Sequence, residues 1–392
     1  MAKRHFVGVS LTSQIRRVQE LLLARTGADE FYETIRLLVA KAFHERSRAT
    51  APLTFERAHI LLTENSAEVM RFVEGVPSFS APPDLVNECL RVLDPVKLND
   101  IKFEALDAAF EEMTSRHYKS DKGQFFTPRH VIELCIDVLR PGKTDTVCDP
   151  ACGSGAFLKA AYDYIGDSRA RRLYGFEISP RASKIASLMS FLGCGDSLKI
   201  HTVDSLRVAG GTLFDGQAAS IEHALADDRL AKAGFDVIAT NPPFAGDVST
   251  SEYVSNYEVA NLSKTRVERD VLFIERCYQL LKPGGRMAIV LPDNKVSASK
   301  FAGLREWMIR KFEVVGVVSL HGYTFRPYTS QKASIVFARK RTGMEAGNDH
   351  MVNFYRSDKA GKTSSGEIVL ADGSIDHDLD EIAQDFKREW VL

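Results

Sequence analysis

The chain has 392 residues, of which 44% are hydrophobic and 26% are charged, and its formal net charge is -1. These proportions are typical of a soluble globular protein, and the length makes two domains the default expectation. No stretch reaches the roughly 20 consecutive apolar residues of a membrane-spanning helix, and the basic N-terminus lacks the apolar run of a signal peptide.

The first 112 residues read as helical. Apolar residues recur there at three- and four-residue spacing, as in Ile15, Val18 and Leu22, which places them on one face of a helix. Pro82 and Pro83 are expected to open another helix, because proline is tolerated in a first helical turn. We therefore expect an all-helical N-terminal domain over residues 1–112.

From about Gly123, short β-rich runs alternate with helical runs. Such alternation predicts an α/β domain with a parallel, doubly wound, Rossmann-like sheet, which we place at residues 113–342. Residues 334–338 read as a last strand, and its closeness to the strand before it favours an antiparallel direction. The runs that read as buried parallel strands are 146–148, 172–176, 198–202, 237–239, 286–291 and 314–319.

The last fifty residues, 343–392, read as a C-terminal extension. Glycines punctuate residues 353–372, which are therefore expected to be hairpin-like. An acidic helix is expected from about Asp378 to Trp390.

The most informative block is Asp149-Pro-Ala-Cys-Gly-Ser-Gly-Ala-Phe-Leu158, a glycine-rich turn after a predicted strand. Ligands of doubly wound sheets bind beyond the carboxyl ends of the strands, where Asp149 lies. Gly153 and Gly155 let the backbone approach a ligand closely. The block differs from the dinucleotide fingerprint, so it suits a cofactor that has no pyrophosphate.

Three acidic residues follow three successive predicted strands. Asp149 follows the first, Glu177 can accept hydrogen bonds from both ribose hydroxyls, and Asp204 can accept one from an adenine amino group. Any one of them alone is as readily a solvated helix cap, but all three in this order indicate a nucleoside site.

A second block, Asn241-Pro-Pro-Phe244, follows the predicted strand at 237–239. The Asn241 side-chain carbonyl and the Pro242 backbone carbonyl can accept the hydrogens of an exocyclic amine, whose lone pair then points at an electrophile. Pro242 and Pro243 restrict the backbone, and Phe244 can stack on a flat substrate. A merely rigid turn is the alternative. Together the two blocks predict methyl transfer from S-adenosylmethionine to an amino nitrogen.

These blocks, preceded by Gly123-Gln-Phe-Phe-Thr-Pro-Arg129, resemble the N6-adenine DNA methyltransferases, and most closely the modification subunits of type I restriction-modification systems. The likeness covers residues 100–340, and the order of the three blocks is specific. It implies adenine methylation of DNA, with the target base flipped out of the duplex.

The resemblance also implies roles for individual residues. Phe126, Thr127 and Pro128 would contact the methionine part of S-adenosylmethionine. The remaining cofactor contacts would come from residues at the strand ends, around the methionine carboxylate and amine, the ribose and the adenine: Asp149, Gly153, Gly155, Glu177, Ile178, Asp204 and Ser205. The target adenine would be held by Asn241, Pro242 and Phe244.

The resemblance implies partners as well. Modification subunits of this family are commonly longer and carry a C-terminal helical region that grips a specificity subunit. This chain stops at Leu392 and lacks a segment long enough for its own target-recognition domain, so we expect a separate specificity subunit and, in the same system, a restriction subunit. Methylation of a protein glutamine or an RNA base, or a cofactor-binding scaffold in a defence complex, stays open as an alternative.

Charge and cysteine content constrain the same expectation. A net charge of -1 implies a local basic cleft, a partner that supplies DNA affinity, or no nucleic-acid binding. Basic residues flank the blocks, although each can equally be an ordinary solvated charge: Lys119, Lys122, Arg129, Lys264, Arg266, Arg326 and Lys332. The six cysteines lack zinc-site spacing, so we expect no metal and reduced thiols in a cytoplasmic protein.

Overall fold

The computed structural model describes residues 10–101, 105–110, 113, 126–166, 172–208, 219–244, 246–248, 256–262, 266–343 and 351–390. The chain divides into two compact units, one of residues 1–120 and 184–196, the other of residues 121–183 and 197–392. The domain limits expected from sequence, after residues 112 and 342, stay predictions. No helix in the described ranges is both long and apolar enough to cross a membrane.

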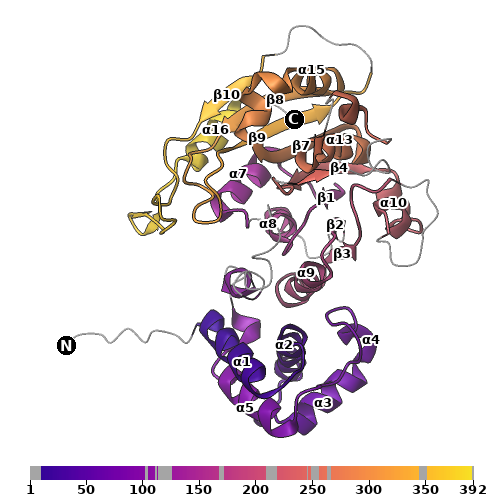
Figure 1. Ribbon diagram of the computed structural model, residues 1–392, viewed down its shortest axis with the longest axis vertical. Helices are drawn as coiled ribbons and strands as arrows, with labels where there is room; N and C mark the ends of the chain where they lie inside the picture. The colour runs from indigo at the N-terminus through magenta and orange to yellow at the C-terminus, as the bar shows by residue number, and fades with distance from the viewer. Residues whose placement is uncertain are drawn as a thin grey trace. The chain divides into compact units, whose positions relative to one another are not determined.

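All regular secondary structure in the described residues of the first unit is helical, as its apolar periodicity predicts (Figure 1). Asp29 caps the second helix, because its carboxylate accepts the N–H groups of Phe31 and Tyr32 at 3.0 and 3.4 Å. Pro83 opens the fifth helix, as expected. The elements are α1 (Leu11–Arg25), α2 (Glu30–Arg46), α3 (Phe55–Glu64), α4 (Ser66–Val69), α5 (Pro83–Leu93) and η1 (Leu98–Asp100).

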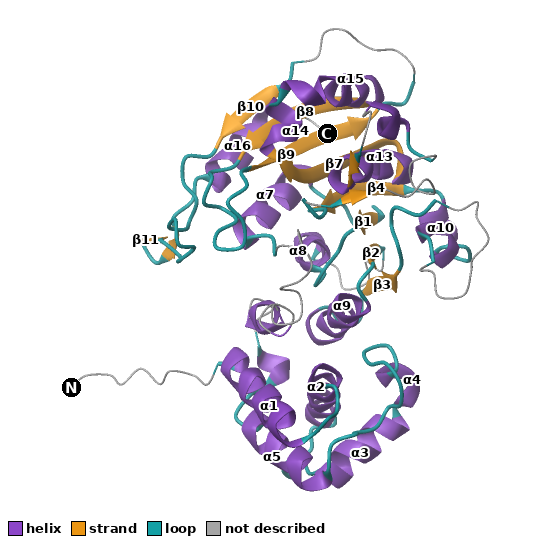
Figure 2. Ribbon diagram, in the orientation of Figure 1, coloured by secondary structure: helices purple, strands orange, loops and turns teal. Residues whose placement is uncertain are grey.

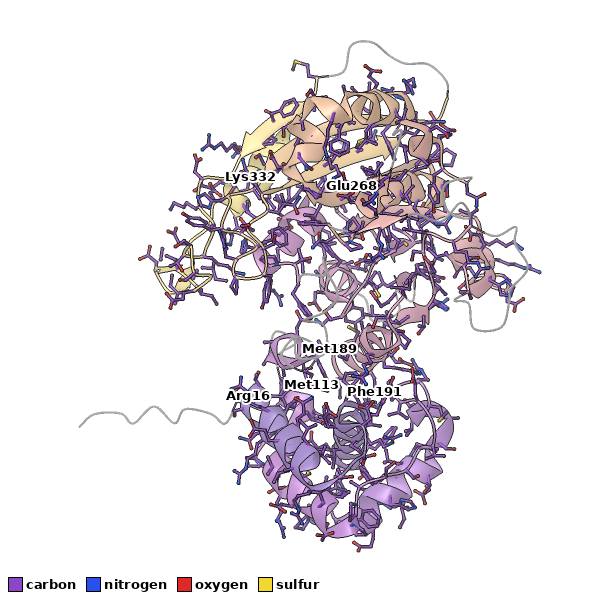
Figure 3. All side chains as sticks on the ribbon, viewed as in Figure 1. Arg16, Met113, Met189, Phe191, Glu268 and Lys332 are labelled. Carbon is purple, nitrogen blue, oxygen red and sulfur yellow. The ribbon has the colours of Figure 1, made fainter. Side chains whose placement is uncertain are left out.

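The core of this helical unit includes part of α9 (Pro180–Gly193). Ile15, Val18 and Leu22 of α1 are fully buried in it, so the predicted apolar face is confirmed. Figure 3 labels two members from α9, Met189 and Phe191. The periodic apolar residues of α1 therefore share one core with α9, which begins only at Pro180 in the sequence.

The second unit is built on an eight-stranded sheet with the order β10-β8-β9-β7-β4-β1-β2-β3. All strands of this sheet are parallel to one another except β9, which is antiparallel to both of its neighbours. The strands are β1 (Val147–Asp149), β2 (Leu173–Glu177), β3 (Leu198–Thr202), β4 (Phe235–Thr240), β7 (Leu281–Pro292), β8 (Phe312–Ser319), β9 (Ala333–Lys340) and β10 (Asn353–Arg356).

The seven strands predicted from buried apolar runs are all present, within a few residues of their expected limits. The antiparallel direction of β9 is also confirmed. The helical elements between and after the strands are α7 (Arg129–Leu139), α8 (Ala156–Ile165), α10 (Ile221–Ala224), α11 (Arg229–Lys232), η2 (Glu258–Leu262), α13 (Arg269–Leu280), α14 (Asp293–Ser297), η3 (Ser299–Phe301), α15 (Ala302–Lys311) and α16 (Leu379–Glu389).

Helices cover both faces of this sheet (Figure 2). On one face, α13 and α15 share a core with inward residues of the central strands such as Cys148, Ile238 and Met287. On the other face, Phe386 of α16 packs on Phe337 of β9, with ring centroids 4.8 Å apart, and α16 lies against α7. This arrangement is the doubly wound α/β fold that the alternation of strands and helices predicts.

The stretch expected to be hairpin-like, residues 353–372, divides into two parts. Its first residues form β10, an edge strand parallel to β8. Its later residues are hairpin-like as expected: Lys362 and Ile368 form an isolated antiparallel bridge, and β11 (Leu370–Ala371) pairs with β12 (Ser374–Ile375) directly after it. In β10, half-buried residues alternate with exposed ones such as Phe354. The strand therefore lacks the buried apolar run by which the other strands are recognised in the sequence.

Candidate active site

Asp149 ends β1 with its side chain buried in the unit. Its Oδ1 accepts the Ala151 N–H at 3.0 Å and the Thr240 hydroxyl at 2.7 Å. Burial raises the pKa of this carboxyl to about 7, against the lowering effect of those two hydrogen bonds. Thr240 ends β4, so one carboxylate ties together the two strand ends that precede the two sequence blocks.

The glycine-rich turn between β1 and α8 has the backbone that its glycines predict. Gly153 and Gly155 have φ angles of +52° and +86°, where residues with a Cβ are strained. A Cβ at Gly153 would meet no described atom within 4 Å. The turn therefore presents bare backbone to an open space, in which a ligand can approach it closely.

Glu177 at the end of β2 is bound to this turn. Its Oε2 accepts the Gly153 N–H at 3.1 Å, and its Oε1 accepts the Ser179 N–H at 2.9 Å. Burial raises the pKa of the Glu177 carboxyl, while both hydrogen bonds act to lower it. The next residue, Ile178, is 55% exposed, so a large apolar side chain lies beside a buried carboxylate at the strand end.

The segment after β3 forms a tight turn. Asp204 Oδ1 accepts the Leu206 N–H at 3.0 Å, and the Ser205 hydroxyl donates to the Pro150 carbonyl at 2.6 Å. Ser205 therefore connects this turn to the glycine-rich turn. Both side chains are buried.

The three acidic residues lie at the same edge of the sheet, because β1, β2 and β3 are adjacent and parallel. The edge also has an open glycine turn and an exposed Ile178. A nucleoside-containing cofactor needs carboxylates that accept hydrogen bonds from its hydroxyl and amino groups. It also needs backbone that it can approach closely and an apolar side chain against its flat ring. The residues present therefore fit S-adenosylmethionine.

Asn241 is oriented by Thr127. Its Nδ2 donates to the Thr127 Oγ1 at 2.9 Å across 114 residues of sequence. Its Oδ1 is buried and has no hydrogen-bond partner among the described residues. A buried acceptor without a donor costs free energy, so this oxygen is suited to a ligand's amino hydrogens.

Phe126, Thr127 and Pro128 are half-buried and lead directly into α7. The contact between Thr127 and Asn241 brings the first of the three predicted blocks against the last. The beginning of that first block, residues 123–125, lies outside the described residues.

The rest of the Asn-Pro-Pro-Phe block is packed into the protein. Pro242 is buried and Pro243 half-buried. Phe244 is 4% exposed, and its ring meets that of Phe325 edge-on, with centroids 5.7 Å apart. Phe325 belongs to the aromatic turn at residues 323–328 that follows β8, and this turn therefore supports the catalytic block. Stacking of Phe244 on a substrate ring stays a prediction.

The polar loop that follows this block, residues 245–269, is described in part. Asp247–Val248 (β5) pairs with Val267–Glu268 (β6), which closes the base of the loop. Glu268, labelled in Figure 3, forms an ion pair with the buried Lys295, whose Nζ lies 2.5 Å from the Glu268 Oε2. Residues 245, 249–255 and 263–265 lie outside the described ranges, and a lid role for the loop stays a prediction.

Three of the basic residues expected near DNA, Arg129, Arg266 and Lys332, have an acidic neighbour within 4.0 Å. Arg129 pairs with Glu133, and Arg266 lies 3.1 Å from Asp247. Lys119, Lys122 and Lys264 fall outside the described residues. All six cysteines are free and buried, and the described residues contain no cluster of side chains that could hold a metal ion.

Three features of this site are not evident from sequence patterns. Thr240 places a hydroxyl at the end of β4, and its bond to Asp149 spans 91 residues. Tyr257 and Arg276 are buried behind the turn after β3 and donate to its carbonyls. Long-range contacts of this kind have no fixed spacing, so only the fold reveals them.

The geometry agrees with the comparisons. A family model described as N-6 DNA Methylase matches residues 104–388. The methylase subunit of the type I restriction enzyme EcoEI from Escherichia coli is 26% identical over 263 residues, 62% of this chain and 49% of that protein. The EcoKI methylase subunit of E. coli K12 is 32% identical over 197 residues, 45% of this chain and 32% of that one. The chain thus spans half or less of these relatives' length.

A solved structure has the same fold over nearly the whole chain. The type I restriction-modification system methyltransferase subunit from Streptococcus thermophilus superposes with a TM-score of 0.62 at 16% identity, covering 97% of this chain and 93% of that one. Because 97% of the chain is covered, the similarity includes residues of both units.

Proposed function

We propose, on the premise that this chain belongs to the N-6 DNA methylase family, that it transfers a methyl group from S-adenosylmethionine to the N6 amino group of adenine in DNA. The observation that carries this proposal is Asn241. Its amide nitrogen is engaged by Thr127, so its buried carbonyl oxygen is the atom presented to a substrate. An amine with hydrogens to donate is the group that this acceptor suits.

The protein's contribution to the reaction is orientation. The exocyclic nitrogen of adenine is a weak nucleophile, because its lone pair is delocalised into the ring. Acceptance of its hydrogens by the Asn241 Oδ1 and the Pro242 carbonyl would favour a tetrahedral nitrogen and direct its lone pair at the methyl carbon. In this arrangement the nitrogen–carbon bond would form as the carbon–sulfur bond breaks, and the proton that the nitrogen releases would pass to solvent.

The cofactor would be held at the ends of β1, β2 and β3. When bound there, S-adenosylmethionine supplies an electrophilic methyl group on a positively charged sulfur. We assign Asp149, Gly153, Gly155 and the Phe126–Pro128 segment to its methionine part, and Glu177 to its ribose. We assign Ile178, Asp204 and Ser205 to the adenine, on the strength of their shared edge of the sheet.

The target adenine must leave the duplex to reach Asn241, because the amino group is paired inside it. We assign Phe244, together with Pro243, to the wall of the pocket that receives the base. The near-neutral charge of the chain supports a separate specificity subunit that supplies much of the DNA affinity. We therefore propose that the chain acts as the modification subunit of a restriction-modification system that also includes a restriction subunit.

The direct test is transfer of labelled methyl from S-adenosylmethionine to genomic DNA free of prior methylation, followed by nucleoside analysis. The protein would be assayed alone and with the product of a neighbouring specificity-like gene. N6-methyladenine is the expected product, in larger amount when the specificity protein is present. Label in protein or RNA and none in DNA, with cofactor binding intact, would contradict the proposal.

A further inference from the structure

The turn after β3 is held from behind by two buried side chains that the proposed reaction does not use. Arg276 Nε donates to the Ser205 carbonyl at 2.6 Å, and the Tyr257 hydroxyl donates to the Leu206 carbonyl, also at 2.6 Å. Arg276 is 1% exposed and Tyr257 is 2% exposed. Two consecutive carbonyls of the turn therefore depend on these two donors.

Tyr257 begins a segment that is itself firmly anchored. The Glu275 carboxylate accepts the N–H groups of Glu258 and Val259 at 3.0 and 2.9 Å, one with each oxygen. The Trp307 indole donates to Glu258 at 2.9 Å. Tyr257 is thus part of a rigid connection and not of a free loop.

Arg276 is anchored in the same way. Its guanidinium lies 2.7 Å from Glu222 and donates to Gln279 at 3.1 Å. Arg276 and Glu275 are neighbours on α13. One helical turn therefore holds the turn after β3 through Arg276 and the segment of Tyr257 through Glu275.

The two connected segments belong to different parts of the proposed site. The turn after β3 contains Asp204 and Ser205, assigned above to the cofactor adenine. Residues 256–262 lie in the described part of the chain that follows Phe244 of the catalytic block. Displacement of the turn would break the Tyr257 bond and leave a buried carbonyl without a donor, which is costly.

We infer that Tyr257 and Arg276 are positioning residues that couple the adenine edge of the cofactor site to the segment after the catalytic block. This inference rests on the proposed function. Binding of the cofactor at the turn would stabilise residues 256–262, and by linkage an ordered 256–262 segment would strengthen cofactor binding. The cofactor would thereby add to the stability of a segment that Glu275 and Trp307 already anchor.

The first test uses the substitution Tyr257→Phe, which removes one hydroxyl and keeps the ring. S-adenosylhomocysteine is the probe, and its Kd is measured by calorimetry with the full chain. We expect an increase of about tenfold, because the turn then populates its binding-competent form less often. Tyr174→Phe is the matched control: Tyr174 is buried too, and its hydroxyl donates to Asp228 away from the turn. Its Kd should stay that of the wild type.

The second test needs no variant. Hydrogen exchange of the wild-type chain is measured with and without S-adenosylhomocysteine. Coupling predicts slower exchange at residues 256–262 as well as at the three strand ends. Exchange slowed at the strand ends alone would overturn the inference even if Tyr257→Phe failed to fold.

The outcomes separate this inference from the function on which it rests. A Tyr257→Phe variant with wild-type Kd, or with the same Kd as Tyr174→Phe at matched melting temperature, overturns the coupling and leaves the methyltransferase proposal in place. A wild-type chain that does not bind S-adenosylhomocysteine overturns the cofactor assignment and the coupling together. A raised Kd for Tyr257→Phe alone, with protection of 256–262 in the wild type, supports both.

Discussion

The two halves of the proposed site differ in how their polar groups are satisfied. In the cofactor half, at the ends of β1, β2 and β3, each of Asp149, Glu177 and Asp204 accepts at least one hydrogen bond from the protein itself. In the target half, at the end of β4, the Asn241 Oδ1 is buried and has no partner among the described residues.

This difference indicates that the two halves are preorganised for their ligands in different ways. The cofactor half is fixed before a ligand arrives, because its carboxylates bind neighbouring backbone and thereby set the shape of the turns. In the target half, the Asn241 Oδ1 is an acceptor without a donor among the described residues, which lowers the stability of the free protein. A hydrogen bond from the substrate would restore that free energy. Four predictions follow from this contrast, in order of decreasing effect.

The largest effect is expected from Asn241→Ala. Loss of a preorganised acceptor should reduce methyl transfer by about a thousandfold, while the Kd of S-adenosylhomocysteine stays close to that of the wild type. Single-turnover transfer and calorimetry would measure the two quantities. Equal losses in both would remove the distinction between the halves and the role assigned to Asn241.

The second prediction concerns pH. The pKa of the Asp149 carboxyl is raised from 3.8 to about 7, so the folded chain holds a proton that the unfolded chain has lost. The free energy of unfolding should therefore fall as pH rises from about 4 through about 7. Asp149→Asn accepts the same hydrogen bonds without a charge, and should remove this slope, which amounts to about 4 kcal/mol over the whole range.

Thermal unfolding of both proteins across this pH range measures the effect. The wild type should lose stability relative to Asp149→Asn between about pH 4 and about pH 7, and no further above that range. Parallel pH profiles would contradict the raised pKa and the buried state of the carboxyl.

The third prediction compares two threonines whose hydroxyls hydrogen-bond different halves of the site: Thr127 bonds Asn241, and Thr240 bonds Asp149. Thr127→Val frees the Asn241 amide, so transfer at saturating cofactor should fall by about tenfold, while cofactor affinity should fall less, because Thr127 belongs to the segment assigned to the methionine part. Thr240→Val removes a donor to Asp149, so the Kd of S-adenosylhomocysteine should rise by about the same factor. The reverse pattern in the same two assays would show that the halves are not separable.

The smallest effect is expected from the C-terminal segment. The Lys362 ammonium donates to the Arg326 carbonyl at 2.9 Å, in the turn whose Phe325 packs on Phe244. Lys362→Met should reduce transfer about threefold by loosening that turn. Lys359→Met removes an exposed ion pair with Asp376 and should change nothing measurable. Equal activities of the two variants would exclude support of the target half from this segment.

Much of the fold could be predicted from sequence, because buried parallel strands are continuous apolar runs. The runs that became β1, β2 and β4 also placed Asp149, Glu177 and Asn241 at strand ends. Contacts between residues that are far apart in the sequence could not be predicted. Neither the Asp149–Thr240 bond nor the Asn241–Thr127 bond follows from any spacing, and it is these contacts that distinguish the two halves.

The edge strand β10 shows a second limit of sequence reasoning. Its four residues alternate between half-buried and exposed, and Phe354 is 77% exposed. A pattern this short does not distinguish an edge strand from a hairpin arm. Only pairing with β8, which depends on the sheet already present, determines its place.

The contact between α16 and α7 has a consequence for synthesis of the chain. α7 directly follows the Phe126–Pro128 segment, yet it is bound by residues that are synthesised much later. Lys387 donates a hydrogen bond to Asp137, and the Trp390 carbonyl accepts one from Arg140, each across 250 residues. While the ribosome is still making the last strands, the apolar face that α16 covers is open to solvent. Folding of this unit is therefore completed only after residue 390 has emerged, and a nascent chain arrested before α16 should be open to proteases and chaperones at α7.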